Sequence, residues 1–294
     1  MYLKQFNKDS SSILKYMPYV LCFLGFMALN IIASKLMAVN SSAVIEDTII
    51  KLGKNGTLLT LLIPFAFFLL LLFLWWKFIH GYSVKQLTTA RTKVDWNRIF
   101  FSFSLWFFFN LILLAISYAL EPESYQFQFN ITAFIPLLII ALIFIPIQTS
   151  FEEYFFRGYF MQFIAFISKN RAVALFSTSI IFGLMHFSNP EVSSMGFSIM
   201  IFYIGCGLAL AIMTLMDDGL ELALGFHAAN NLFGALFITT ESAVFQTDAL
   251  FVFDGESNIY EIFIQVFIIF PILLYIFSKK YNWANWQQKL FKAI

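Results

Sequence analysis

Two adjacent carboxylates, Glu152 and Glu153, interrupt an otherwise apolar chain, and Arg157 follows Glu153 by four residues. The chain is 60% hydrophobic and only 12% charged. A charged side chain at the centre of a membrane helix costs roughly 2.5–3.5 kcal/mol on insertion scales, so such residues mark candidate functional sites. A buried carboxylate can act as a general base. The spacing of Glu153 and Arg157 predicts an ion pair within one helix.

Two histidines lie in other apolar segments, at His186 and His227, and Asn231 follows His227 by one helical turn. A carboxylate beside an imidazole is the arrangement that general-base activation of water requires. A second histidine with an asparagine can donate hydrogen bonds to a developing oxyanion. Alternatively, Glu152, His186 and His227 could bind Zn²⁺, whose bound water would be the nucleophile. The common soluble zinc-protease motif, H-E-x-x-H, is absent from the sequence.

Each of these features also has a structural interpretation without chemistry. A buried glutamate–arginine pair can simply brace helices, and a lone histidine in an apolar helix more often packs than catalyses. His227 and Asn231 could form hydrogen bonds between helices, and proton relays use the same residue types. His80 lies in a basic loop, where we expect a solvated polar side chain. The ordered combination of motifs is what favours a catalytic site.

The positions of these residues along the chain predict a common depth in the membrane. If the chain forms an antiparallel helical pair around residues 169–171, Glu152 and His186 lie about equally far from the turn, roughly 20–25 Å at 1.5 Å per residue. The following helices return the chain, so that His227 and Asn231 come back to the same depth. We therefore expect four polar side chains from three helices to meet in one buried pocket.

Apolar segments of about 17–25 residues recur along the chain, which predicts an all-α, polytopic bundle of about eight transmembrane helices in the cell membrane. The expected crossings are 16–34, 58–76, 99–120, 131–168, 172–187, 194–216, 220–239 and 259–277. Segment 131–168 is long enough to cross twice, and Pro136 and Pro146 are compatible with a break. The positive-inside rule favours one crossing by a long or broken helix, because the basic tail then shares the cytoplasmic side with the amino terminus.

Charge and cysteine usage exclude several other classes of protein. The formal net charge of +1 gives no nucleic-acid footprint. Cys22 and Cys206 lie in apolar segments, so neither a disulfide framework nor a cysteine zinc cluster is predicted. No soluble domain is evident, and the bilayer is the expected partner. We divide the chain into a three-span region (1–130), a catalytic core (131–239) and an acidic loop with the last span and basic tail (240–294).

Three short motifs, taken in their order and spacing, resemble those of the CPBP family of intramembrane proteases, which includes the CAAX prenyl protease type II and bacteriocin-processing (Abi) proteins. The motifs are Glu152-Glu153-x-x-x-Arg157, Phe182-x-x-x-His186 and His227-x-x-x-Asn231. Gly158 after the arginine is also typical of the family. The resemblance covers 131–239, and the remaining spans match only as membrane helices.

The resemblance implies an intramembrane endopeptidase whose substrate is a prenylated CAAX-type protein or a bacteriocin-like peptide. Carried over by position, Glu152 and His186 would activate the attacking water. His227 and Asn231 would stabilise the oxyanion or help to hold a metal.

The remaining motif residues, Glu153 and Arg157, would shape the site. The resemblance leaves open both a zinc-dependent mechanism, with Glu152, His186 and His227 as ligands, and a glutamate-activated water without metal. A non-catalytic immunity or scaffold protein is the alternative function. A transporter with a carboxylate–arginine coupling site is disfavoured, because we see no inverted repeat. The sequence predicts neither a particular substrate nor an oligomeric state.

Overall fold

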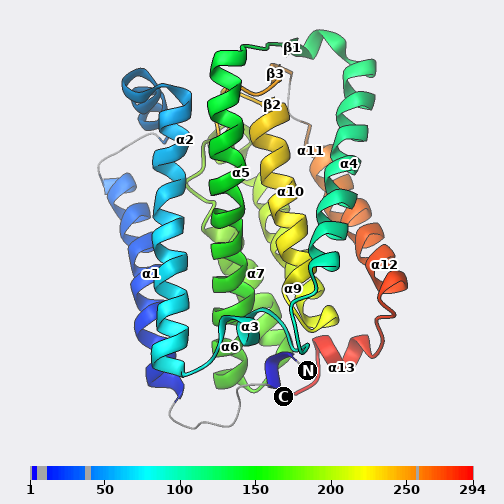
Figure 1. The fold of residues 1–294 in the computed structure, drawn as a ribbon. Helices are drawn as coiled ribbons and strands as arrows, with labels where there is room; N and C mark the ends of the chain where they lie inside the picture. The colour runs from blue at the N-terminus through cyan, green and yellow to red at the C-terminus, as the bar shows by residue number, and fades with distance from the viewer. Residues whose placement is uncertain (1, 5–11, 37–40, 256–257, 294) are drawn as a thin grey trace.

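The computed structural model describes residues 2–4, 12–36, 41–255 and 258–293, and it forms a bundle of long helices (Figure 1). The α-helices are α1 (Ser12–Leu36), α2 (Ser41–Trp75), α3 (Val84–Thr88), α4 (Trp96–Leu120), α5 (Ile131–Glu153), α6 (Met161–Ser168), α7 (Arg171–Leu184), α8 (Pro190–Met195), α9 (Ile199–Asp217), α10 (Glu221–Phe237), α11 (Ile259–Ile264), α12 (Phe270–Lys280) and α13 (Trp286–Leu290). The π-helical turns are η2 (Trp76–His80), η4 (Tyr154–Phe160) and η6 (Gln265–Ile269). The 3₁₀ turns are η1 (Tyr2–Lys4), η3 (Pro122–Ser124) and η5 (Gly196–Ser198).

The predicted fold class, a polytopic all-α membrane bundle, is confirmed. Helices long and apolar enough to cross a membrane run over Ser41–His80, Trp96–Leu120, Ile131–Ser168, Pro190–Asp217 and Ile259–Lys280. Two shorter apolar helices, Ile13–Leu29 and Arg171–Leu184, overlap the first and fifth predicted crossings. The chain is a multi-pass membrane protein.

The segment that is long enough to cross twice forms one continuous helical run from Ile131 to Ser168, which agrees with the predicted long helix. Pro136 and Pro146 lie inside α5 without ending it. The irregularity comes later, as the π-helical turn η4, which begins directly after Glu153. Single π-helical turns inside α-helices are frequent at functional sites.

The structure departs from the predicted elements at the start of α2 and at one end of the bundle. Helix α2 begins at Ser41, not at residue 58, so residues 41–57, which precede the second predicted crossing, are helical as well, with a kink at Gly53, whose φ is 70°. A small sheet at one end of the bundle, in the order β1-β3-β2, adds strands to the predicted helices. Its strands are β1 (Tyr125–Phe127), β2 (Ile238–Thr239) and β3 (Phe251–Phe253), with β3 antiparallel to β1 and parallel to β2.

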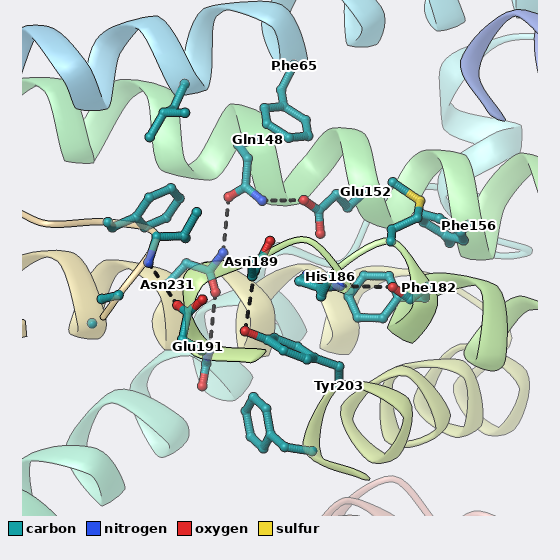
Figure 2. Close-up of a pocket in the computed structure, with 18 of the residues that line it drawn as sticks. Phe65, Gln148, Glu152, Phe156, Phe182, His186, Asn189, Glu191, Tyr203 and Asn231 are labelled. Carbon is teal, nitrogen blue, oxygen red and sulfur yellow. Dashed lines mark hydrogen bonds between the residues drawn. The ribbon is translucent and has the colours of Figure 1, made fainter. Parts of the chain in front are cut away.

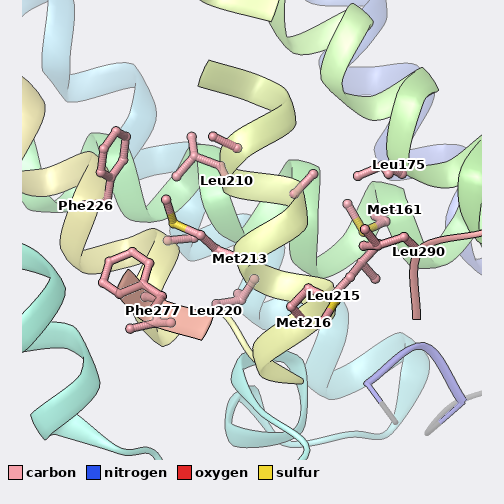
Figure 3. Packing of buried hydrophobic residues seen from close by; sticks show 14 of the residues in the cluster. Met161, Leu175, Leu210, Met213, Leu215, Met216, Leu220, Phe226, Phe277 and Leu290 are labelled. Carbon is pink, nitrogen blue, oxygen red and sulfur yellow. The ribbon is translucent and has the colours of Figure 1, made fainter. Parts of the chain in front are cut away.

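Small residues let the helices that carry the motifs approach their neighbours closely. A Cβ on Gly225 of α10 would lie 2.1 Å from the carbonyl oxygen of Ile99 in α4. A Cβ on Gly207 of α9 would lie 2.9 Å from the carbonyl oxygen of Ser179 in α7. Helix α9 lies at the centre of the largest buried apolar cluster (Figure 3). Close packing through glycine is the usual basis of helix association in lipid.

A buried ion cluster fixes the end of the bundle that holds both chain termini. Asp217, at the end of α9, accepts hydrogen bonds from Arg91, Arg98 and the Trp283 indole. Arg91 also pairs with Glu221 at the start of α10, at 3.1 Å. The cluster therefore ties the α3–α4 loop and the carboxyl-terminal tail to the two helices that frame the site.

Candidate active site

The predicted site residues come from four places in the bundle that the fold brings together. Glu152 and Glu153 end α5, Arg157 lies in η4, and His227 lies in α10. His186 was expected inside a helix, but it lies beyond α7, which ends at Leu184. The chain turns there because the His186 amide bonds to the Gly183 carbonyl, three residues back, which tightens the end of the helix.

A cavity of about 400 Å³ holds three of the six predicted residues in its wall. Glu152, His186 and Asn231 line it, together with mostly apolar side chains from α1, α2, α7, α9 and residues 243–245 (Figure 2). The remaining three, Glu153, Arg157 and His227, do not line this cavity. The site thus has a layer exposed to the cavity and a layer of buried groups behind it.

The buried layer is a chain of charged hydrogen bonds that ends on His227. Arg157 Nη1 donates to Glu153 Oε1 at 2.8 Å, and Arg157 Nη2 donates to the Gly207 carbonyl at 3.1 Å. The same Glu153 oxygen accepts from His227 Nδ1 at 2.7 Å. A carboxylate only accepts, so the Nδ1 atom carries the proton and the ring orientation is fixed. His227 Nε2 consequently faces Glu152 Oε2, at 3.6 Å.

Glu152 is held by an amide relay from α10. Gln148, one turn earlier on α5, donates to Glu152 Oε1 and accepts from Asn231 Nδ2 at 3.1 Å. Asn230 in turn donates to Asn231 Oδ1 at 3.2 Å. The other carboxylate oxygen, Glu152 Oε2, is buried and has no hydrogen-bond partner in the described part of the chain. This relay leaves one carboxylate oxygen available to bind and deprotonate a water.

His186 is oriented by one hydrogen bond and one ring stack. Its Nδ1 lies 2.9 Å from the Phe182 carbonyl oxygen, which can only accept, so Nδ1 donates and Nε2 keeps its lone pair. The Tyr203 ring stacks on the imidazole with centroids 4.2 Å apart and planes inclined by 17°. Asn189 donates to the Tyr203 hydroxyl at 3.3 Å. Figure 2 shows His186 between Glu152 and Tyr203.

Five polar lining residues were not among the predicted site residues: Gln148, Asn189, Glu191, Tyr203 and Asn230. A signal for Gln148 was available, because it stands four residues before Glu152 on the same helical face. Tyr203 and Glu191 lie in or near helices whose rotation the sequence leaves undefined. The third histidine, His80, is half-buried: it packs against Tyr16 and Trp76 and lies 3.1 Å from the Tyr159 hydroxyl, so its side chain is less solvated than expected.

The predicted zinc ligands do not form a ready metal site. Across residues 2–4, 12–36, 41–255 and 258–293, no group of three or more His, Cys, Asp or Glu side chains is arranged to hold a metal ion. Both imidazoles use Nδ1 in protein hydrogen bonds, so only the Nε2 lone pairs could ligate a metal. The arrangement instead places the Glu152 carboxylate and one oriented imidazole, His186, on a mostly apolar cavity, with the His227 ring buried behind Glu152.

Comparison with known proteins gives two matches. The family model described as type II CAAX prenyl endopeptidase Rce1-like matches residues 131–233, which include all six predicted site residues. An uncharacterised protein of Bacillus subtilis strain 168, YyaK, is 34% identical over 208 residues, covering 69% of this chain and 70% of the relative. No solved structure matches.

Proposed function

The chain belongs to the Rce1-like family of type II CAAX prenyl endopeptidases, and from that premise we propose that it cleaves a peptide bond in or beside the bilayer with Glu152 as the base. The observation that carries this proposal is that Glu152 Oε2 is buried without a hydrogen-bond partner in the described chain. This oxygen lies 3.6 Å from His227 Nε2, and Glu152 lines the same cavity as His186. A water held there meets a carboxylate acceptor, as general-base catalysis requires.

The proposed reaction is a single hydrolysis that uses the chain's own groups. Water binds between Glu152 Oε2 and His186 Nε2, and its oxygen attacks the scissile carbonyl carbon while Glu152 takes one proton. The second Nδ2 hydrogen of Asn231 stabilises the oxyanion, and His227 does so from Nε2 when that atom also carries a proton. The C–N bond then breaks, and the proton held by Glu152 passes to the leaving amine. Glu153 and Arg157 keep the His227 ring in place and touch neither water nor substrate.

The proposed substrate is a membrane-associated peptide, either a CAAX-type prenylated protein or a bacteriocin-like precursor. The mostly apolar cavity wall supports a substrate that arrives from lipid. Zinc remains a separate proposal, with Glu152, His186 and His227 as its ligands. None of the steps above uses a metal.

The test is hydrolysis of a quenched prenylated peptide by the purified protein, compared with Glu152→Gln and His186→Ala. We expect both variants to lose at least about 10²-fold in kcat, the usual contribution of a positioned acid–base group. Exposed Glu241→Gln is the matched control and should keep full activity. Equal hydrolysis by all four proteins would overturn the assignment. Metal analysis and chelation of the same preparation test the zinc proposal, which predicts bound zinc and reversible loss of activity.

A further inference from the structure

We propose that Glu191 makes this cavity selective for substrates that carry a positive charge near the scissile bond, as a lysine or arginine side chain or a free amino group. The inference rests on the proposed function, because it concerns what the same cavity accepts. Glu191 lies in α8, two residues after Asn189, and lines the cavity with Glu152 and His186. Figure 2 shows it among the lining side chains, near Tyr203.

The Glu191 carboxylate is only half satisfied within the described residues. Its Oε1 accepts from the Val244 amide at 2.9 Å, while Oε2 is buried without a hydrogen-bond partner. A buried polar atom that lacks a partner costs free energy, and the cost is larger for a charged group. Such an atom in a native structure needs an explanation, such as a ligand that supplies the missing donor.

The charge of the cavity indicates which donor is missing. Its described lining contains two carboxylates, Glu152 and Glu191, and neither lysine nor arginine. The nearby buried cation, Arg157, is already bonded to Glu153 and to the Gly207 carbonyl. A substrate cation would therefore gain a charge-assisted hydrogen bond that a neutral analogue could not form, and a substrate carboxylate placed there would be repelled.

A metal ion is a poorer occupant of Glu191 Oε2 than a substrate cation, because Glu191 belongs to no group of three or more His, Cys, Asp or Glu side chains in the described chain that could hold one. The Val244 amide bonds only to Glu191 Oε1. A cation bound at Oε2 would therefore leave this bond between α8 and the cavity-lining residues 243–245 intact. Glu191 would then select substrates without taking part in bond cleavage.

The experiment uses quenched peptides that differ at one scanned position, carrying either lysine or its neutral analogue norleucine. We expect the wild-type protein to prefer lysine at one position by about tenfold or more in kcat/KM. Glu191→Gln keeps the shape of the side chain and the acceptor for Val244, and should reduce the preference to within about twofold. Glu191→Lys should instead prefer a third peptide, which carries glutamate at that position. Exposed Glu241→Gln should behave as wild type.

A lysine preference that survives in Glu191→Gln, or no preference at any position in the wild type, would overturn the inference. Measurements of peptide binding distinguish failure of this inference from failure of the proposed function. If no peptide is hydrolysed, the Kd of fluorescently labelled lysine and norleucine peptides still tests Glu191. We then expect Glu191→Gln to weaken the lysine peptide about tenfold and leave the norleucine peptide unchanged. Equal weakening of both peptides would contradict a charge-selective role.

Discussion

At the scale of single residues, Glu153 and Arg157 differ from Glu152 in their access to the cavity, although all three lie within six positions. Glu152 reaches the cavity, whereas the side chains of Glu153 and Arg157 are completely buried and turn to His227 and α9. The pair fixes the tautomer of His227, as carboxylate–histidine pairs do at metal and catalytic centres.

Glu153→Gln should lower kcat by about 10- to 100-fold with little change in KM, because the amide no longer fixes His227 Nδ1 as the donor. The kcat and KM of the variant, measured across pH, check this. A purely structural role would instead lower the melting temperature and leave the activity of the folded fraction unchanged.

Substitutions at Tyr203 can separate the contribution of its ring, which stacks on His186, from the contribution of its hydroxyl. Tyr203→Phe keeps the ring and should retain kcat within about twofold, whereas Tyr203→Leu should lose roughly 2- to 10-fold, since an aromatic pair contributes about 0.5–1.5 kcal/mol. Steady-state kinetics of the two variants decide between the roles. Equal losses would mean that the hydroxyl, not the stack, matters.

At the scale of helices, the site depends on how closely α10 packs on α4. The Gly225 position admits no Cβ because the Ile99 carbonyl oxygen would lie 2.1 Å away, whereas an added Cβ on Gly234 in the same helix would meet no described atom within 4 Å outside its own turn of helix. Backbone atoms move less readily than flexible side chains, so this contact sets the position of His227 and Asn231.

Gly225→Ala should therefore destabilise the protein by about 1–3 kcal/mol, the usual cost of overpacking. Gly234→Ala is the matched control and should be neutral or stabilising by up to about 1 kcal/mol, since alanine favours helix. Thermal unfolding in detergent measures both. A Gly225→Ala protein as stable as Gly234→Ala would show that α4 and α10 can separate without cost.

At the scale of the whole molecule, the two ends of the bundle differ in charge. The termini and the basic α2–α4 connection lie at one end, and the sheet lies at the other (Figure 1). Acidic residues at the sheet end include Glu121, Glu123, Glu241, Asp248 and Asp254. Ile238 of β2 and Val244 also line the cavity, so the cavity borders on the sheet end. The positive-inside rule then predicts a cytoplasmic terminal end and an outward-facing sheet end.

Cysteine labelling tests this orientation in a background that lacks Cys22 and Cys206. Ser193→Cys, exposed in α8, should react with a membrane-impermeant maleimide in intact cells. Thr92→Cys, exposed in the basic connection, should react only after permeabilisation. The reverse pattern would place the cavity on the cytosolic side.

The sequence by itself determined the membrane bundle and identified the polar residues that the structure gathers, whose catalytic roles remain predictions. Long apolar runs define helices in lipid, and Glu152, His186 and His227 stand out because charge and imidazole are rare there. Helical spacing also indicates the Glu153–Arg157 pair, since residues four apart lie on one face.

Only the tertiary structure decided which of these side chains reach the cavity and which support it. His227 meets Glu153 across 74 positions of sequence, and Tyr203 meets His186 across a change of helix. Such contacts depend on the rotation and separation of packed helices, which glycine contacts such as that of Gly225 set. The roles of Gln148, Tyr203 and Glu191 therefore emerge from packing, because no local pattern specifies how one helix faces the next.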